Sequence, residues 1–353
     1  MCNLSEFSEF FSQGWQSNVQ KYLVPKTLGG FEGSLLDYSK AIRFSSRHDG
    51  STGWRLLIGA TLNGAVAAFG TDEAVEKIFT NKDKSNKSVI VAGQTSPRAE
   101  VEIIGKEFQL SGKFKFGSGL KEANWVLCGF THPTDGGHRL AIIPKNKVKV
   151  QGGWSTFGLS ETDSVDYKID PVMVTPEFTF LHDTVNPLRD CPTFRSGIAT
   201  VMLAGHIGFA IGIAEQALVD ITKLVSSERR SGKLIERDDF LIGYGRQQAT
   251  LKSIISFAES CLSAADNSVK SQDLSQAHKD EIRIAAIHTT ESARNIVRFI
   301  FDYAGMTSAS KTSSLNRAFR DMHVASQHLL VNSSQYKPIV NRMIEALDDQ
   351  QKS

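Results

Sequence analysis

The segment FRSGIATVMLAGHIGFAIGIAEQALVDITKLVSSERR, residues 194–230, decides the fold class of this 353-residue chain. Its most apolar part, from Ile198 to Ala214, is interrupted by His206 and three glycines and falls short of the roughly 20 residues that a membrane span needs. We therefore predict a long helix buried inside the protein. The glycines lie within this helix and not at a strand-to-helix turn, so we expect a close-packing face and not a dinucleotide-binding loop.

Three further helical patterns follow, over residues 238–266, 275–305 and 315–347. In each of them apolar residues recur three and four positions apart, which is typical of amphipathic helices. Long helices joined by short loops pack as an antiparallel bundle. The sequence therefore predicts a C-terminal four-helix bundle over residues 191–353.

The first part of the chain predicts two other units. Residues 1–86 have helical spacing, and Asp72 is expected to cap the short helix that begins with EAVEKIF. From residue 87 to 190, short β-branched and aromatic runs such as SVIVAG, NWVLCGF and HRLAIIP alternate with turn residues, which predicts a compact β domain. The predicted fold class is mainly α with a β insert.

Composition excludes several classes of protein. The chain has 40 Lys and Arg against 38 Asp and Glu, with no long run of one sign, so we expect neither a nucleic-acid-binding stripe nor a polybasic membrane anchor. The four cysteines form no Cys-x-x-Cys pair, which argues against a disulfide framework or zinc ribbon. The opening MCNLSEFSEFFSQGW lacks the basic and apolar regions of a signal peptide, so we predict a cytoplasmic protein.

The order of helices, β insert and bundle resembles the acyl-CoA dehydrogenase superfamily, and several segments resemble it at matching places. One of them, AGMTSASKTSSLNRAFRDMHVASQH, is similar to the end motif of the two-component (group D) flavin-dependent monooxygenases. The resemblance implies an N-terminal helical domain, a central β-barrel-like domain and a closing bundle. The other segments are VPKTLGGFEG, GSTGW and AGQTSPRAEVEIIGKEFQLSGKFKFGSGLKEANWVLCG.

The same resemblance implies bound FAD or FMN between the strands and the bundle. It places the hydroxyl of Ser118 near N5 or O4 of the flavin, with Phe116 or Phe114 shielding one face of the ring. The alternative is that these phenylalanines, which alternate with lysines, belong to an ordinary half-buried strand. The implied cofactor-binding residues on the two strand edges are Thr95, Ser96, Phe116, Gly117 and Ser118.

Two histidines in the end motif are candidate catalytic residues by resemblance. A histidine in this region assists proton transfer beside substrate and flavin in the monooxygenase branch, which favours His328 first and His323 second; alternatively, one of them caps or packs in the bundle. The two are five positions apart, or about 140° around a helix, so they do not share a tight metal-binding face and a metal site is disfavoured.

Four arginines are candidate phosphate ligands. Arg317, Arg320 and Asp321 lie within about one helical turn. Arg320 with Asp321 either anchors this helix to its neighbours or reaches a phosphate, and Arg317 and Arg320 are the candidate ligands of the flavin phosphate. The resemblance gives Arg229 or Arg230 a similar role toward the flavin of a neighbouring subunit, and a solvated loop is the alternative for them.

The chain departs from the family pattern at the positions of the catalytic base, and this departure indicates which reaction to expect. Acyl-CoA dehydrogenases use a glutamate base, but MHVASQHLLVNSSQ contains no carboxylate, and RDCPTFRSG offers only Asp190. We therefore predict an oxygenase component that takes reduced flavin from a separate reductase and uses O2 to hydroxylate or N-oxidise a small molecule. The alternatives are a divergent FAD-containing acyl-CoA dehydrogenase and a catalytically silent binding protein. Family members form dimers or tetramers, so we expect a homo-oligomer.

Overall fold

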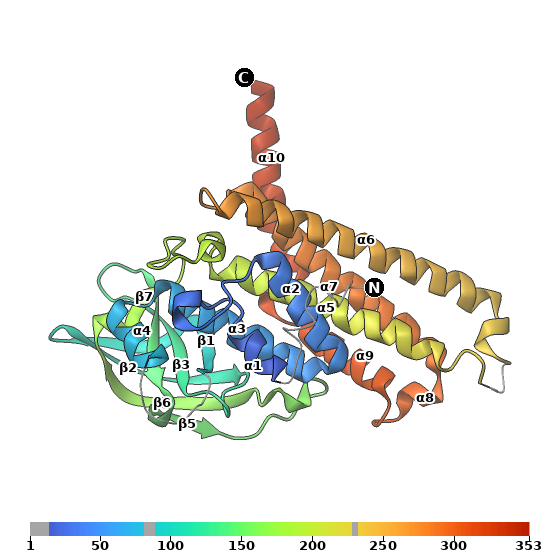
Figure 1. Ribbon diagram of the computed structural model, residues 1–353, viewed down its shortest axis with the longest axis horizontal. Helices are drawn as coiled ribbons and strands as arrows, with labels where there is room; N and C mark the ends of the chain where they lie inside the picture. The colour runs from blue at the N-terminus through green and yellow to red at the C-terminus, as the bar shows by residue number, and fades with distance from the viewer. Residues whose placement is uncertain (1–13, 81–88, 228–231, 353) are drawn as a thin grey trace.

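The computed structural model describes residues 14–80, 89–227 and 232–352 of the chain (Figure 1). The N-terminal helices begin at polar caps: the side chain of Ser34 accepts from the amide of Asp37, and that of Asp49 from the amide of Thr52. The expected cap at Asp72 is wrong by one residue, because the hydroxyl of Thr71 accepts from the amide of Ala74 while Asp72 pairs with Arg189. These helices are α1 (Trp15–Gln20), η2 (Lys26–Leu28), α2 (Leu35–His48), α3 (Gly50–Phe69) and α4 (Asp72–Phe79).

Within the described residues, seven strands form one sheet in the order β5-β6-β2-β1-β3-β4-β7. Only β1 and β3 pair in parallel, and their register shifts between Gln94 and Pro97 and again between Pro97 and Ala99. Such irregularities change the direction in which side chains point. Here they fall on β1, whose residues line the candidate active site. The strands are β1 (Val91–Ile104), β2 (Glu107–Gly117), β3 (Trp125–Thr131), β4 (His138–Pro144), β5 (Val148–Gln151), β6 (Val165–Val174) and β7 (Thr179–Leu181).

The centre of the helical part is α5, which packs beside α2, α6, α7 and α9 (Figure 1). In the described chain it is the one helix long and apolar enough to cross a membrane, yet 89% of its apolar window is buried, as in a core helix. A Cβ on Gly208 would lie 2.1 Å from the carbonyl oxygen of Ser39 on α2, so the predicted close-packing face is confirmed. The helices are α5 (Ile198–Thr222), η7 (Leu234–Glu236), α6 (Asp238–Val269), α7 (Gln276–Ala304), α8 (Met306–Ala309), α9 (Ser314–Ala325) and α10 (Tyr336–Lys352).

The single helix expected over residues 315–347 is wrong. It ends at Ala325, and two short turns, η8 (Leu329–Val331) and η9 (Ser333–Gln335), precede α10, which extends away from the body (Figure 1). The reason is local: the side chains of Ser326 and Asn332 bond nearby backbone groups and so compete with the helical ladder. The break also carries His328 out of the helix.

The predicted fold class, helical with a β insert, is confirmed by this arrangement and by the structural match given below. The predicted boundary at 86/87 lies outside the described residues. The boundary at 190/191 falls between β7 and α5. The division into units that fold separately stays a prediction.

Candidate active site

A cavity of about 520 Å³ lies where α3, β1 and the end of β2 meet the start of α5 and the turn after α9. Its walls are mainly aromatic and aliphatic side chains, and none of the described residues that line it is an aspartate or glutamate. The lining residues are Trp54, Ile58, Leu62, Gly93, Gln94, Thr95, Ser96, Arg98, Phe116, Ser118, Trp154, Leu159, Ser164, His182, Ile198, Ala199, Met202, Val324, Gln327, His328, Leu329 and Leu330.

Ser118 lies in a chain of hydrogen bonds whose direction can be derived. At its far end the hydroxyl of Thr162 donates to the carbonyl of Leu159 at 2.7 Å, so in its 2.7 Å bond with Ser164 the Thr162 oxygen must accept. The Ser164 hydrogen is then committed, and in the 2.6 Å bond between Ser118 and Ser164 it is Ser118 that donates. Because Nε1 of Trp54 donates to Ser118 at 3.1 Å, the Ser118 oxygen keeps one lone pair and no free hydrogen.

The far end of this chain is held by Asp321. Its Oδ1 accepts from the amide of Leu159 at 2.6 Å, and burial raises the pKa of this carboxyl to about 6. Asp321 thus connects α9 to the loop on which the serine chain ends. The sequence suggested such an anchoring position for this residue.

His328 and His206 form what we call the buried pair, with ring centres 4.5 Å apart. Trp54 packs edge-on against both rings, at 5.2 Å from His206 and 5.8 Å from His328. Burial lowers the pKa of His328 to about 4, and burial together with the nearby His328 holds the pKa of His206 well below its ordinary value. Both imidazoles are therefore neutral at neutral pH.

The tautomer of His328 follows from its contacts. Its Nδ1 caps η8 by accepting from the amide of Leu330 at 3.4 Å, so the proton of the neutral ring is on Nε2. In His206, Nε2 is buried and has no hydrogen-bond partner among the described residues. Nε2–H of His328 is the group left to donate a hydrogen bond to a bound molecule.

The remaining predicted strand residues are only partly brought together. Thr95 and Ser96 line the cavity. Phe116 is 62% exposed at its rim, with left-handed backbone (φ 63°) and its ring edge-on to Trp154. Gly117 is buried against Tyr167, outside the cavity wall, and Phe114 stacks on the same tyrosine at 5.0 Å in the core. Phe114 therefore does not shield the cavity.

The second histidine and the arginines of the end motif lie elsewhere. His323 bonds the carbonyl of Phe319 at 2.7 Å and packs on that ring. Arg317 pairs with Asp49 at 3.2 Å, and Arg320 bonds Asn316 and the carbonyl of Phe157, so both arginines fix α9 in place. None of the three lines the cavity. The pair Arg229 and Arg230 lies outside the described residues.

Two residues at or directly behind the cavity wall, Trp54 and His206, received no role from the sequence. The sequence did contain a pattern that could have identified His206, since it is the one titratable side chain within the apolar run from Ile198 to Ala214. Trp54 stands in the GSTGW segment but is separated by 64 positions from Ser118, to which it donates. No local pattern could have joined these residues, because only the fold brings them together.

Comparison with known proteins identifies the family. Residues 204–333 match the family model described as acyl-CoA dehydrogenase, C-terminal domain. Indole-3-acetate monooxygenase from Pseudomonas putida is 27% identical over 339 residues, which covers 90% of this chain and 82% of the relative. The structure of XiaF from Streptomyces sp., in complex with FADH2 and glycerol, matches with a TM-score of 0.81 at 16% identity, covering 93% of this chain and 90% of that chain. The C-terminal part of the chain, residues 204–333, therefore belongs to the acyl-CoA dehydrogenase family.

The relatives that align with most of the chain are oxygenases of two-component flavin-dependent systems. The oxygenase component of p-hydroxyphenylacetate 3-hydroxylase from Acinetobacter baumannii is 22% identical over 372 residues, which covers 94% of this chain and 81% of the relative. The protein is accordingly a flavin-dependent oxidoreductase, and monooxygenation is favoured over acyl-CoA dehydrogenation. Asp190, the alternative dehydrogenase base, is exposed and does not line the cavity.

The residues present fit a flavin. The cavity volume is in the range of small-molecule sites. Apolar walls suit the faces of a planar ring, and Thr95, Ser96 and Ser118 offer polar atoms for its edges. The single lone pair left on Ser118 suits a donor, and N5 of a flavin carries a hydrogen only when the flavin is reduced.

Proposed function

We propose that this protein is an oxygenase component that binds reduced FMN or FAD and inserts one atom of O2 into a small aromatic substrate. The observation that carries the proposal is the hydrogen-bond chain through Ser118, which leaves an acceptor and no donor facing the cavity. An acceptor there favours the reduced flavin, whose N5–H can donate to it. The aromatic substrate is proposed from Trp54, the apolar walls and the aromatic substrates in the relatives' names.

Each protein group has a distinct part in this proposal. Ser118 and Trp54 orient the flavin edge, while Thr95 and Ser96 would hold the opposite edge from β1. Bound reduced flavin supplies the electrons that activate O2. The apolar walls exclude water, which protects this chemistry from side reactions. His328 donates a hydrogen bond to the substrate through Nε2–H, because its ring is neutral at neutral pH and its Nδ1 accepts from Leu330.

The test is rapid mixing of the protein and anaerobically reduced FMN or FAD with oxygenated buffer. We expect flavin absorbance to return more slowly than in free solution, and, with an aromatic substrate, oxygenated product to form in preference to hydrogen peroxide. Return of the absorbance at the rate of free flavin, together with equal affinity for oxidised and reduced flavin, would contradict the proposal. Binding of neither redox form would instead indicate a silent binding protein.

The relatives' names make a separate flavin reductase the partner that supplies reduced flavin. We further propose that the protein is a dimer or tetramer, because α10 extends from the body with an exposed apolar face that includes Val340, Met343, Ile344 and Leu347 (Figure 1). Light scattering after size exclusion tests this, and a monomer at micromolar concentration would refute it. The free buried thiols of Cys128, Cys191 and Cys261 agree with the expected cytoplasmic location.

A further inference from the structure

Arg98 is the one side chain of fixed charge among the described residues that line the cavity. It lies on β1, is exposed, and makes no ion pair or hydrogen bond to another described residue. The shifted register of β1 is what allows Thr95, Ser96 and Arg98 all to border the same space. A guanidinium offers a planar fork of N–H donors that matches a carboxylate or a phosphate.

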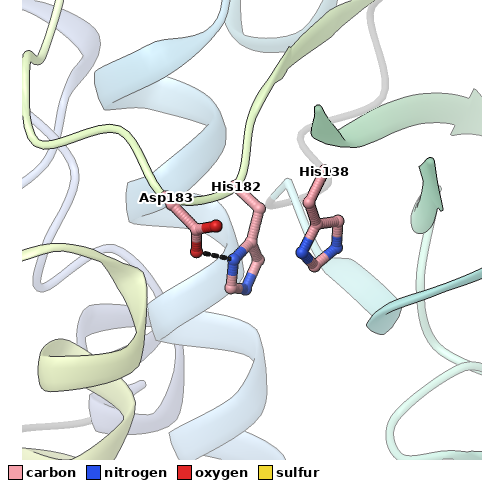
Figure 2. Close-up of side chains that lie close together, drawn as sticks. All are labelled: His138, His182 and Asp183. Atoms are coloured by element: carbon pink, nitrogen blue, oxygen red, sulfur yellow. Dashed lines mark hydrogen bonds and ion pairs between the residues drawn. The ribbon is translucent and has the colours of Figure 1, made fainter. Parts of the chain in front are cut away.

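A histidine with an aspartate partner lines the same cavity. Nδ1 of His182 lies 2.6 Å from Oδ1 of Asp183, and the ring of His182 stacks on His138 at 4.1 Å (Figure 2). His138 in turn bonds the carbonyl of Thr95 through Nε2 at 2.7 Å. These contacts hold the His182 ring beside β1. When both ring nitrogens of His182 carry hydrogens, Nδ1–H donates to Asp183 and Nε2–H is left to donate to an anion.

A metal ion is a poor explanation for this group, although its three ligand atoms lie within 4.8 Å of one another. The imidazole lone pairs lie in the ring planes, and the planes of His138 and His182 are only 14° from parallel (Figure 2). Two stacked, nearly parallel rings cannot both direct a lone pair at one ion. In addition, one nitrogen of each ring is already bonded, to Thr95 and to Asp183.

We propose that Arg98 and His182 form a subsite for an oxyanion at the β1 end of the cavity, and that its ligand is the carboxylate of an aromatic acid substrate. The inference rests on the proposed function and specifies its substrate class. Apolar walls, a single fixed positive charge and the absence of any acidic side chain from the described lining complement a planar molecule with one acidic group. The phosphate of the flavin is the other source of the same chemistry.

Two matched ligand pairs separate these sources. Indole-3-acetate and indole-3-acetamide have the same shape and differ in charge, and FMN differs from riboflavin by its phosphate. Dissociation constants for all four are measured with the full chain, with Arg98→Gln and with Lys113→Gln. Lys113 is an exposed cation on β2 that does not line the cavity, so its variant controls for net charge.

We expect Arg98→Gln to lower the preference for the acid over its amide about ten-fold, the typical effect of losing a charge-assisted hydrogen bond. Lys113→Gln should leave that preference unchanged, and Arg98→Lys should restore part of it. A fall in the FMN-to-riboflavin preference instead assigns the subsite to the flavin phosphate and overturns the carboxylate ligand. A wild-type protein that does not distinguish the acid from its amide also overturns it. If neither preference responds to Arg98→Gln, there is no oxyanion subsite.

These binding measurements need no turnover, so they are separate from the test of the proposed function. A protein that slows flavin reoxidation but shows no effect of Arg98→Gln refutes only the subsite. A protein with the acid preference but reoxidation at the free rate refutes only the oxygenase function. His182→Gln should give a smaller loss of acid preference than Arg98→Gln, because the imidazole has at most one N–H left to donate whereas the guanidinium can donate two parallel hydrogen bonds to a carboxylate.

Discussion

The cavity is lined by one histidine from each of two stacked or tilted pairs, and the two pairs have opposite surroundings. At the helical end, the buried pair of His206 and His328 has almost no polar partners. At the strand end, His138 and His182 are half-buried and are bonded to a backbone carbonyl and a carboxylate. His206 and His328 are thus kept neutral by burial, whereas His182 has a carboxylate partner at Nδ1. We infer a division of work, with hydrogen-bond donation to the reacting group at the buried, helical end and substrate recognition at the strand end.

The largest expected effect comes from removing the hydrogen-bond donor of His328 at the buried end. We expect His328→Phe to lower product formation about 100-fold, the usual cost of losing one preorganised donor in an active site. Affinity for reduced flavin should change little, because the ring assigned to the substrate is not needed to hold the cofactor. His323→Phe is the matched control: His323 contacts Phe319 outside the cavity, so its loss should change product formation less than about two-fold. Equal losses in both variants would show that the role is structural.

The next largest effect is expected from substitutions at and beside Ser118, and it concerns the preference of the protein for reduced over oxidised flavin. Ser118→Ala removes the acceptor and should lower the preference for reduced over oxidised FMN about ten-fold. Ser164→Ala should also lower it, for a different reason: it frees the Ser118 hydrogen, which can then donate to the unprotonated N5 of oxidised flavin. Equilibrium titration of both redox forms measures this. If Ser164→Ala leaves the preference unchanged, the derived direction of the chain is wrong.

The burial of His328 also predicts a pH dependence of stability. Its pKa is about 4 when folded and near 6.5 when unfolded, so the unfolded state binds more protons between these values. The free energy of unfolding should therefore fall by about 3 kcal/mol as pH drops from 6.5 to 4. Asp321 opposes this, because its raised folded pKa of about 6 makes the folded state bind more protons in the same window. Urea unfolding of the wild type and of His328→Phe, compared across this range, isolates the contribution of the imidazole.

The sequence predicted the fold class because each element carries its own period and composition. The apolar run on α5 and the β-branched strands needed no long-range information. The interrupted last helix was not predicted, because apolar spacing continues across residues 315–347 while Ser326 and Asn332 break the backbone ladder through side-chain bonds. A pattern of hydrophobicity does not register such competition.

The site was predicted only where the resemblance supplied a position. Ser118 and His328 do line one cavity, and their roles remain predictions. The direction of the hydrogen bonds at Ser118 could not be predicted from the sequence, since it depends on Thr162 and Trp54, which lie 44 and 64 positions away. His206 and His182 become candidate functional residues only through their neighbours in the folded chain, which are His328 and Asp183 respectively. The contact between His206 and His328 spans 122 positions of the chain.

The smallest expected effect comes from the strand end of the cavity, where Asp183 contacts His182. Asp183 is 82% exposed, so water and salt screen its interaction with His182. We expect Asp183→Asn to weaken binding of an aromatic acid less than about three-fold, and this loss should shrink further when salt is raised from 0.05 to about 0.5 M. His328→Phe should show no such salt dependence, because its site is buried. A loss of product formation in Asp183→Asn as large as that in His328→Phe, and insensitive to salt, would mean that the strand-end pair and not the buried pair acts on the reacting group of the substrate.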